Sequence, residues 1–182
     1  MYAHGKTTER LLLRKVEESD IKPWAEFFKD NPSLPYLGID LNKGPEENAK
    51  EWIEFQFKRY EENRYGHHAL INKETGDFLG MCGLLTQTVE EKKEIEIGYS
   101  LLQKYWGMGY ASEAAQFFRN FGFEHENLDH IISIIDVRNI ASQKVAVRNG
   151  MFIDCQIKYH DLDVYIYQIV RQEWEMLATN NH

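Results

Sequence analysis

Two glycines separate a strand-like segment from a helix-like one, and this junction restricts the fold more than any other part of the chain. Residues 94–102 alternate polar and apolar side chains as a β-strand does. Gly107 and Gly109 follow, and residues 110–125 then carry apolar side chains at helical spacing. Residues 131–136 form a second strand-like run. Such a strand–helix–strand unit predicts two parallel neighbours in one sheet, joined by a right-handed crossover.

The segments on either side of this unit extend the same sheet. An amphipathic helix with Ser19 as its N-cap ends at Asn31-Pro32, and Pro45 opens a second helix that runs to about Asn63. The other predicted elements are strands at 11–16, 68–71, 78–85, 152–159 and 164–170 and a short helix at 141–149. The order β-α-α-β-β-β-α-β-α-β-β predicts an α/β fold with a single mixed, largely antiparallel sheet flanked by helices.

Length and composition indicate one globular domain spanning residues 1–182. The chain is 43% hydrophobic and 13% aromatic, and no Pro/Gly/Ser-rich linker divides it. A chain of this length can bury one core without disulfides or metals. The net charge of -8 leaves no overall basic field that would hold nucleic acid. An acidic surface would attract a cationic partner, but it is also common in proteins where it has no special role.

The cysteines and the apolar runs predict an unsecreted, cytoplasmic protein without a membrane anchor. Cys82 and Cys155 lie in apolar runs and lack CxxC spacing, which is typical of reduced cysteines. Residues 1–6 contain no apolar signal-peptide core, and no apolar run approaches the ~20 residues needed to span a bilayer. The seven histidines show no metal-ligand spacing, so no metal is predicted.

The glycine junction also suggests a ligand. A glycine-rich turn from a strand into a helix exposes backbone N–H groups at the positive end of the helix dipole, where phosphate and pyrophosphate bind. After Gly109 the chain lacks the lysine and hydroxyl of a Walker loop and the third glycine of a dinucleotide-binding fingerprint. Taken alone, the turn is equally compatible with a tight connection that binds nothing.

Several segments in order resemble the GCN5-related N-acetyltransferase (GNAT) superfamily, and within it the RimJ/RimL-type branch. These segments are TERLLLR at 8–14, EIGY at 96–99, YWGMGYASEA at 105–114, DVRNIAS at 136–142 and EW at 173–174. The resemblance covers nearly the whole chain. It implies the acyl-CoA N-acyltransferase fold and transfer of an acetyl group from acetyl-CoA to a primary amine. The acceptor would be a small amine or a protein N-terminus, and the resemblance allows a homodimer.

The resemblance assigns the coenzyme pyrophosphate to the glycine junction. The family pattern is Gln/Arg-x-x-Gly-x-Gly/Ala, in which Gly109 and Ala111 fill the last two fixed positions. Trp106 occupies the first, a departure that is usual in this branch and leaves the contribution of that side chain open. Backbone amides are expected to provide most of the binding. The implied contact residues are Trp106, Gly107, Met108, Gly109, Tyr110, Ala111 and Ser112.

The same resemblance gives the preceding strand a task. In this family it separates from its parallel neighbour near a bulge, expected here at Gly98, and pairs with the pantetheine arm like an added strand. The residues that would do so are Tyr99, Ser100 and Leu101. Asn139 is placed on the coenzyme and Ser142 near its sulfur. From the sequence alone, Asn139 and Ser142 at the start of a helix are equally typical caps.

Acetyl transfer needs a neutral amine and a proton for the departing thiolate. An α-amine has a pKa near ~8 and a lysine amine near ~10.4, so a general base serves both and matters more for lysine. Glu96 shares a strand face with Glu94, lies nearer the thioester position and is the predicted base. His160 and Asp161 are alternatives, and a solvent-facing Glu96 without a catalytic role is equally compatible. Ser142 is predicted to donate to the thiolate or to orient it.

These residues predict an acetyl-CoA-dependent N-acetyltransferase that works by direct transfer in a ternary complex, with no covalent enzyme intermediate. The alternative is a non-catalytic acyl-CoA-binding or regulatory domain on the same fold. Gly109, Ala111 and Asn139 would be present in both, so they do not discriminate between them. Release of thiol in the presence of amines does.

Overall fold

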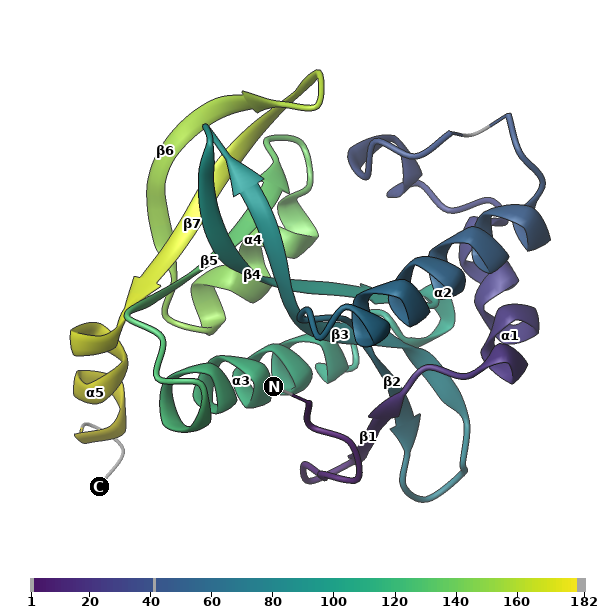
Figure 1. Ribbon diagram of the computed structural model, residues 1–182, viewed down its shortest axis with the longest axis horizontal. Helices are drawn as coiled ribbons and strands as arrows, with labels where there is room; N and C mark the ends of the chain where they lie inside the picture. Colours follow the sequence, from purple (N-terminus) through teal and green to yellow (C-terminus); the bar gives the residue numbers. More distant parts are fainter. Residues whose placement is uncertain (1, 41, 180–182) are drawn as a thin grey trace.

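The computed structural model describes residues 2–40 and 42–179, and its centre is one seven-stranded sheet (Figure 1). The strand order is β1-β2-β3-β4-β5-β7-β6. The strands are β1 Leu11–Lys15, β2 His68–Asn72, β3 Phe78–Val89, β4 Lys92–Leu101, β5 His130–Asp136, β6 Phe152–Tyr159 and β7 Leu162–Val170. Neighbours pair antiparallel except β4 and β5, which are parallel. The predicted fold class and the parallel pair are confirmed.

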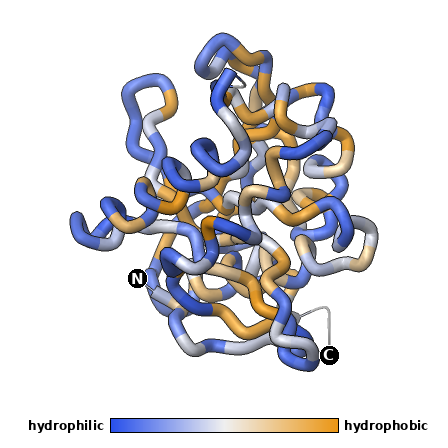
Figure 2. The backbone as a smooth tube through the Cα atoms, turned by 90° about the vertical axis from the view of Figure 1, so that its right-hand side faces the viewer, coloured by the Kyte–Doolittle hydropathy of each residue, from blue (hydrophilic) through white to orange (hydrophobic). Residues whose placement is uncertain are grey.

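Helices cover both faces of this sheet. They are α1 Ile21–Ala25, α2 Pro45–Glu61, α3 Tyr110–His125, α4 Ile140–Arg148 and α5 Arg171–Thr179. In Figure 1, α1 and α2 lie together at the right-hand side, and α3, α4 and α5 lie at the centre and left. The tube in Figure 2 is hydrophobic mainly in the interior and hydrophilic at many outer turns. No helix in residues 2–40 and 42–179 has the length and apolar character to cross a membrane.

The period of two in the strands divides the apolar residues between two cores. Leu70 and Cys82 face α3, where Phe118 is 1% exposed. Ala69 and Met81 face the opposite way and pack with Trp24 and the rest of the α1–α2 layer. Successive strand residues point to opposite faces, so each strand contributes to both cores. Consequently α2 and α3 lie on opposite sides of the sheet and can each wall a different part of a site at its middle.

The first helix is irregular, and its predicted cap is wrong. Helical residues begin with the 3-10 turn Glu18–Asp20, followed by α1 and a second 3-10 turn, Glu26–Phe28. Asp20, not Ser19, provides the capping carboxylate, accepting from the Glu17 N–H at 2.8 Å. Arg14 holds the same carboxylate with two bonds of 2.7 Å. This ion pair between β1 and the 3-10 turn therefore helps to set where the first helix begins.

The predicted element order also stops short of α5. This helix begins directly where β7 ends, and the Glu173 carboxylate accepts from the Val170 N–H at 3.1 Å. Trp174 stacks on Phe123 at 5.2 Å and donates from Nε1 to Asn120 Oδ1 at 2.9 Å, which docks α5 against α3. No glycine or proline lies between strand and helix, so this boundary has no signal in the sequence.

The bulge predicted at Gly98 is also wrong. β4 pairs with β3 from Lys92 to Leu101 without a shift in register. A Cβ at Gly98 would lie 2.7 Å from Leu85 Cδ1 and 3.1 Å from His67 Nε2. The glycine is needed for this close approach of side chains from β3 and from the start of β2, and not for an altered strand path.

Candidate active site

The candidate site begins where β4 and β5 separate. Among the described residues their parallel pairing is limited to Glu96 opposite Ile132. Beyond that point Ser133 Oγ donates to the Ile97 carbonyl at 2.9 Å, and Trp106 Nε1 donates to the Leu101 carbonyl at 2.7 Å. Alternation along β4 directs the N–H and C=O of Tyr99 and the N–H of Leu101 towards the edge that β5 has left. An extended ligand can pair with these groups as an added strand.

The glycine turn follows directly from this edge. Gly107 and Gly109 have φ of 74° and 84°, in the left-handed region that glycine occupies without a steric penalty. Gly109 is the N-cap of α3 and supplies no side-chain cap. The first N–H groups of α3 are therefore available to an anion, which the helix dipole also favours.

An ion pair from the other end of the chain holds this turn. Arg10 Nε lies 2.6 Å from Glu113 Oε2, and Arg10 Nη1 donates to the Met108 carbonyl at 2.9 Å. Thr8 Oγ1 and the Arg10 N–H donate to Glu113 Oε1 at 2.5 and 2.8 Å. Burial alone would raise the pKa of Glu113, but the bonds from Thr8 and Arg10 lower it. These contacts of Thr8 and Arg10, here called the clamp, offset the negative charge of Glu113 in the first turn of α3. They also keep the Met108 carbonyl directed at Arg10.

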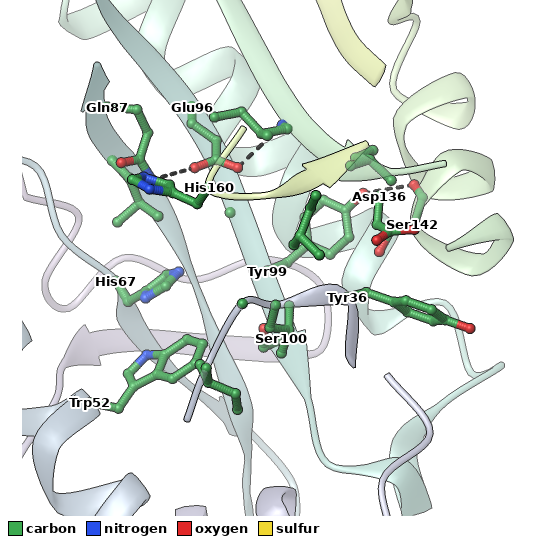
Figure 3. Close-up of a pocket in the computed structure, with 18 of the residues that line it drawn as sticks. Tyr36, Trp52, His67, Gln87, Glu96, Tyr99, Ser100, Asp136, Ser142 and His160 are labelled. Atoms are coloured by element: carbon green, nitrogen blue, oxygen red, sulfur yellow. Dashed lines mark hydrogen bonds between the residues drawn. The ribbon is translucent and has the colours of Figure 1, made fainter. Parts of the chain in front are cut away.

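A cavity of about 680 Å³ opens beside the separated strands (Figure 3). Its walls come from α2, from the segment after the first helix, from the residue before β2, from β3, β4 and β5, from the start of α4, and from the β6–β7 turn. Figure 3 shows Glu96 beside Gln87, while Tyr99 and Ser142 lie together elsewhere along the wall. The cavity thus runs from the predicted general base to the predicted thioester position.

Glu96 is buried, contrary to the solvent-facing alternative. It is 9% exposed, and its oxygens accept from Gln87 Nε2 at 2.7 Å and from the Ile134 N–H at 3.2 Å. Burial raises the pKa of the Glu96 carboxyl, and these two bonds and Arg59 only partly oppose the rise. Glu94, in contrast, lies 2.5 Å from His130 Nε2 and does not line the cavity. A carboxylate with a raised pKa is better matched to accepting a proton near neutral pH.

The start of α4 forms the opposite wall. Asn139 is the N-cap, and its Oδ1 accepts from the Ser142 N–H at 3.2 Å, so Ser142 is capped and is not itself a cap. The Tyr99 hydroxyl donates to the Ser142 carbonyl at 2.8 Å and ties α4 to β4. Burial raises the pKa of Tyr99, so this hydroxyl is a weaker acid than usual. The Ser142 side chain lines the cavity.

Of the other candidate acids and bases, two line the cavity and one does not. His160 lines the cavity from the β6–β7 turn, whereas exposed Asp161 does not. Asp136 also lines it, but the Arg138 side chain bonds to Asp136 at 2.6 Å and lowers the pKa of that carboxyl. No group of three or more potential metal ligands occurs in the part of the chain that the structure describes.

The comparisons with known proteins agree with this architecture. Residues 10–152 match the family model of the acetyltransferase (GNAT) domain. The chain belongs to the GNAT acetyltransferase family. It is 30% identical over 177 residues to the uncharacterized N-acetyltransferase p20 of Bacillus licheniformis, covering 92% of this chain and 96% of the relative. The family assignment favours an enzyme over the non-catalytic acyl-CoA-binding alternative.

Solved structures share the fold of this GNAT chain. An acetyltransferase from Agrobacterium tumefaciens superposes with a TM-score of 0.78 at 25% identity, covering 94% of this chain and 96% of the other. A RimL ribosomal L7/L12 α-N-protein acetyltransferase in complex with coenzyme A has a TM-score of 0.74 at 18% identity, covering 91% and 97%. GNAT acetyltransferases use acetyl-CoA, and this chain, which has an open strand edge and a glycine turn, is a member of that family.

Three cavity residues of this acetyltransferase were missed from the sequence. Trp52 and Arg59 come from α2, and His67 precedes β2. Trp52 and Arg59 share a helix face with Asn48 and Phe55, a spacing that places a cation among apolar residues. A cation on this helix face was the signal that could have identified Arg59 from the sequence. Burial, with Arg59 and His68 nearby, lowers the pKa of His67 to about 3, so its ring is neutral at pH 7.

The burial of Glu96 predicts a pH-dependent loss of stability. A carboxyl whose pKa is raised in the folded chain costs nothing below its unfolded pKa of about 4.3, and destabilises increasingly as pH rises through its folded pKa. In Glu96→Gln the titration is absent. We expect the free energy of unfolding of this variant, minus that of the wild type, to increase from about pH 4 to about pH 8, as measured by urea unfolding. With Glu74→Gln, an exposed control, the difference should stay flat. A flat difference for Glu96→Gln would contradict the buried environment.

Proposed function

We propose that this acetyltransferase transfers an acetyl group from acetyl-CoA to a primary amine by direct transfer in a ternary complex. The observation that supports this most is the connection of three features: an open strand edge, a helix N-terminus with bare amides, and a cavity holding a buried carboxyl. Glu96 lies in that cavity two strand residues from Gly98 and three from Tyr99. No nucleophilic cysteine is required, and buried Cys82 does not line the cavity.

The coenzyme contacts follow from the backbone. The amides from Gly107 to Ser112 would bind the pyrophosphate, and the free groups of Tyr99 to Leu101 would pair with the pantetheine arm. Trp106 would act through its bond to the Leu101 carbonyl, which fixes the junction between edge and turn. Asn139 would keep α4 capped, so that Ser142 stays in place beside the sulfur.

The proton transfers are assigned to Glu96 and Ser142. Glu96 takes the proton of the ammonium, through a water, and the freed nitrogen lone pair attacks the thioester carbonyl carbon. The C–S bond then breaks as the carbonyl re-forms, and the nitrogen passes its second proton through water to the departing thiolate, which leaves as the coenzyme thiol. Ser142 hydrogen-bonds to that thiolate, whose intrinsic pKa of ~8.5 makes it a fairly good leaving group. His160 lines the same cavity and is the remaining alternative for the base.

The acceptor class within this proposal is a small amine or a protein N-terminus. The acidic balance of the chain favours such a cationic acceptor over nucleic acid. A homodimer and a cytoplasmic location stay predictions, the latter supported by Cys82 and Cys155, which are unpaired. The direct test is thiol release from acetyl-CoA with a panel of N-terminal peptides, polyamines and aminoglycosides. Binding of acetyl-CoA without thiol release across the panel would favour the non-catalytic alternative.

Gly109→Val should abolish tight acetyl-CoA binding. The added side chain meets Arg10 Nη2 at 3.3 Å, strains a backbone with positive φ, and fills space beside the exposed amides. Gly76→Val is a matched control, since φ is 75° there and nothing lies within 4 Å of the added Cβ. Acetyl-CoA should raise the melting temperature of the wild type and of Gly76→Val but not of Gly109→Val. Normal binding by a folded Gly109→Val would refute the loop assignment.

Glu96→Gln should lower kcat/KM at neutral pH roughly 10²-fold, the low end for general base catalysis, with little change in acetyl-CoA affinity. The loss should shrink at high pH, where the free amine is already neutral. Ser142→Ala should cost on the order of tenfold, because the thiolate leaves readily, and alkali should not rescue it. Steady-state kinetics across pH measure both. An unaltered pH–rate profile in Glu96→Gln would move the base to His160 or leave catalysis to positioning.

A further inference from the structure

One arginine in the cavity wall is buried without a counter-ion. Arg59 is only 4% exposed, and in the described part of the chain no carboxylate oxygen lies within 4.0 Å of it. Arg10, Arg14 and Arg138 each have a carboxylate partner within 2.7 Å. A buried charge is costly unless it is paired, and arginine stays protonated in proteins. The Arg59 guanidinium carbon lies 4.8 Å from the centre of the Phe55 ring, a cation–π contact that supplies no negative charge, so the positive charge has no ionic partner.

The hydrogen bonds of Arg59 are also incomplete. Nη1 donates to the Tyr65 carbonyl at 3.1 Å and weakly to the Thr86 carbonyl at 3.5 Å, while buried Nε has no partner. Arg119, another buried arginine, donates from Nε, Nη1 and Nη2 to neighbouring oxygens and does not line the cavity. Burial alone therefore does not explain the unused donors of Arg59. Protein atoms enclose Nε, so a ligand in the cavity would be bound through Nη2, which donates to no group among the described residues.

Glu96 does not form an ion pair with Arg59. Its two oxygens already accept from Gln87 and from the Ile134 N–H. Its negative charge nevertheless lies near enough to raise the pKa of Arg59 slightly against the larger lowering effect of burial. Arg59 and Glu96 thus line the same cavity near one another without forming a pair, so a molecule with both an amine and an anion would meet a complementary charge at each residue.

The strand register gives the order of the groups along the cavity. Arg59 contacts Thr86, which pairs with Ile95, one residue before Glu96 on β4. Tyr99 lies three residues beyond Glu96 in the opposite direction, a distance of roughly 10 Å along a strand. A molecule whose amine lies by Glu96, facing the thioester position, would extend its other end towards Arg59.

We propose that the acceptor amine also carries a carboxylate, and that Arg59 is the residue that binds it. This inference rests on the proposed function and narrows its acceptor to amino-acid-like compounds. The planar guanidinium matches the two oxygens of a carboxylate. Trp52 and the neutral His67 also line the cavity, and their rings stack with centroids 6.0 Å apart. Together these groups give one end of the cavity a neutral-to-positive polar lining.

The test compares matched acceptors. Glycine, β-alanine, 4-aminobutyrate and 6-aminohexanoate are each assayed against the corresponding carboxamide, with acetyl-CoA and thiol detection. We expect the best acid to exceed its amide in kcat/KM by roughly tenfold or more, the effect of charge-assisted hydrogen bonds. Arg59→Met should bring the acid-to-amide ratio close to one. Arg64→Met, which removes an exposed arginine paired with Glu62, should leave the ratio unchanged.

A binding measurement separates this inference from the proposed function. Calorimetry with butanoate and hexanoate, which lack an amine, should show binding to the wild type and Arg64→Met, and at least tenfold weaker binding to Arg59→Met. If amines are acetylated but acids are not preferred over amides in the wild type, the inference fails and the proposed function stands. If no acceptor in any panel releases thiol, the proposed function fails. A shifted pH profile with an unchanged acid-to-amide ratio in Arg59→Met would overturn the inference and make Arg59 a counter-ion of Glu96.

Discussion

The separation of β4 from β5 is the constraint on which the rest of the site depends. Buried backbone polar groups must be satisfied, so two strands can part inside a sheet only if other donors replace the ladder. Here the Ser133 hydroxyl donates to the Ile97 carbonyl, and the Trp106 indole N–H donates to the Leu101 carbonyl. The groups of Tyr99 lie between these two and face the opening. The carbonyls at the two ends of the gap are thus hydrogen-bonded, whereas the backbone groups of Tyr99 between them are not paired with β5.

The groups that give the cavity its chemistry are ones that weaken the fold. Glu96 is buried with a raised pKa, His67 is kept neutral with an unpartnered Nδ1, and Arg59 has no carboxylate beside it. Each would be more stable in water or with a full set of partners. Arg59 stands out among these groups, because Arg10, Arg14 and Arg138 each have a carboxylate partner and buried Arg119 donates from three nitrogens, so a ligand anion is the partner that its charge lacks. Binding of those ligands would then stabilise the folded chain by mass action.

The sequence predicts most of the element order, the parallel strand pair and α3 well, because these depend on local period and on one glycine junction. It fails where a contact between elements decides the outcome. Arg14 of β1 holds Asp20 at the start of the first helix, and a side chain at Gly98 would collide with Leu85 of β3 and with His67, which precedes β2. Arg59 escaped notice for the same reason: helical spacing places it on the inner face of α2, but only the fold shows that its charge is unmatched. Pairing partners, unlike periodicity, cannot be derived from neighbours in the chain.

The clamp on the glycine turn shows how such distant contacts can serve the coenzyme. A carboxylate in the first turn of a helix is favourable by itself, since it interacts with the helix dipole, but it would compete there with a phosphate. Glu113 is withdrawn from that competition by Thr8 and Arg10, which hold both of its oxygens from the segment before β1. The same guanidinium binds the Met108 carbonyl and lies 4.2 Å from the centre of the Tyr110 ring. The segment before β1 therefore helps to determine which charges and dipoles the glycine turn presents.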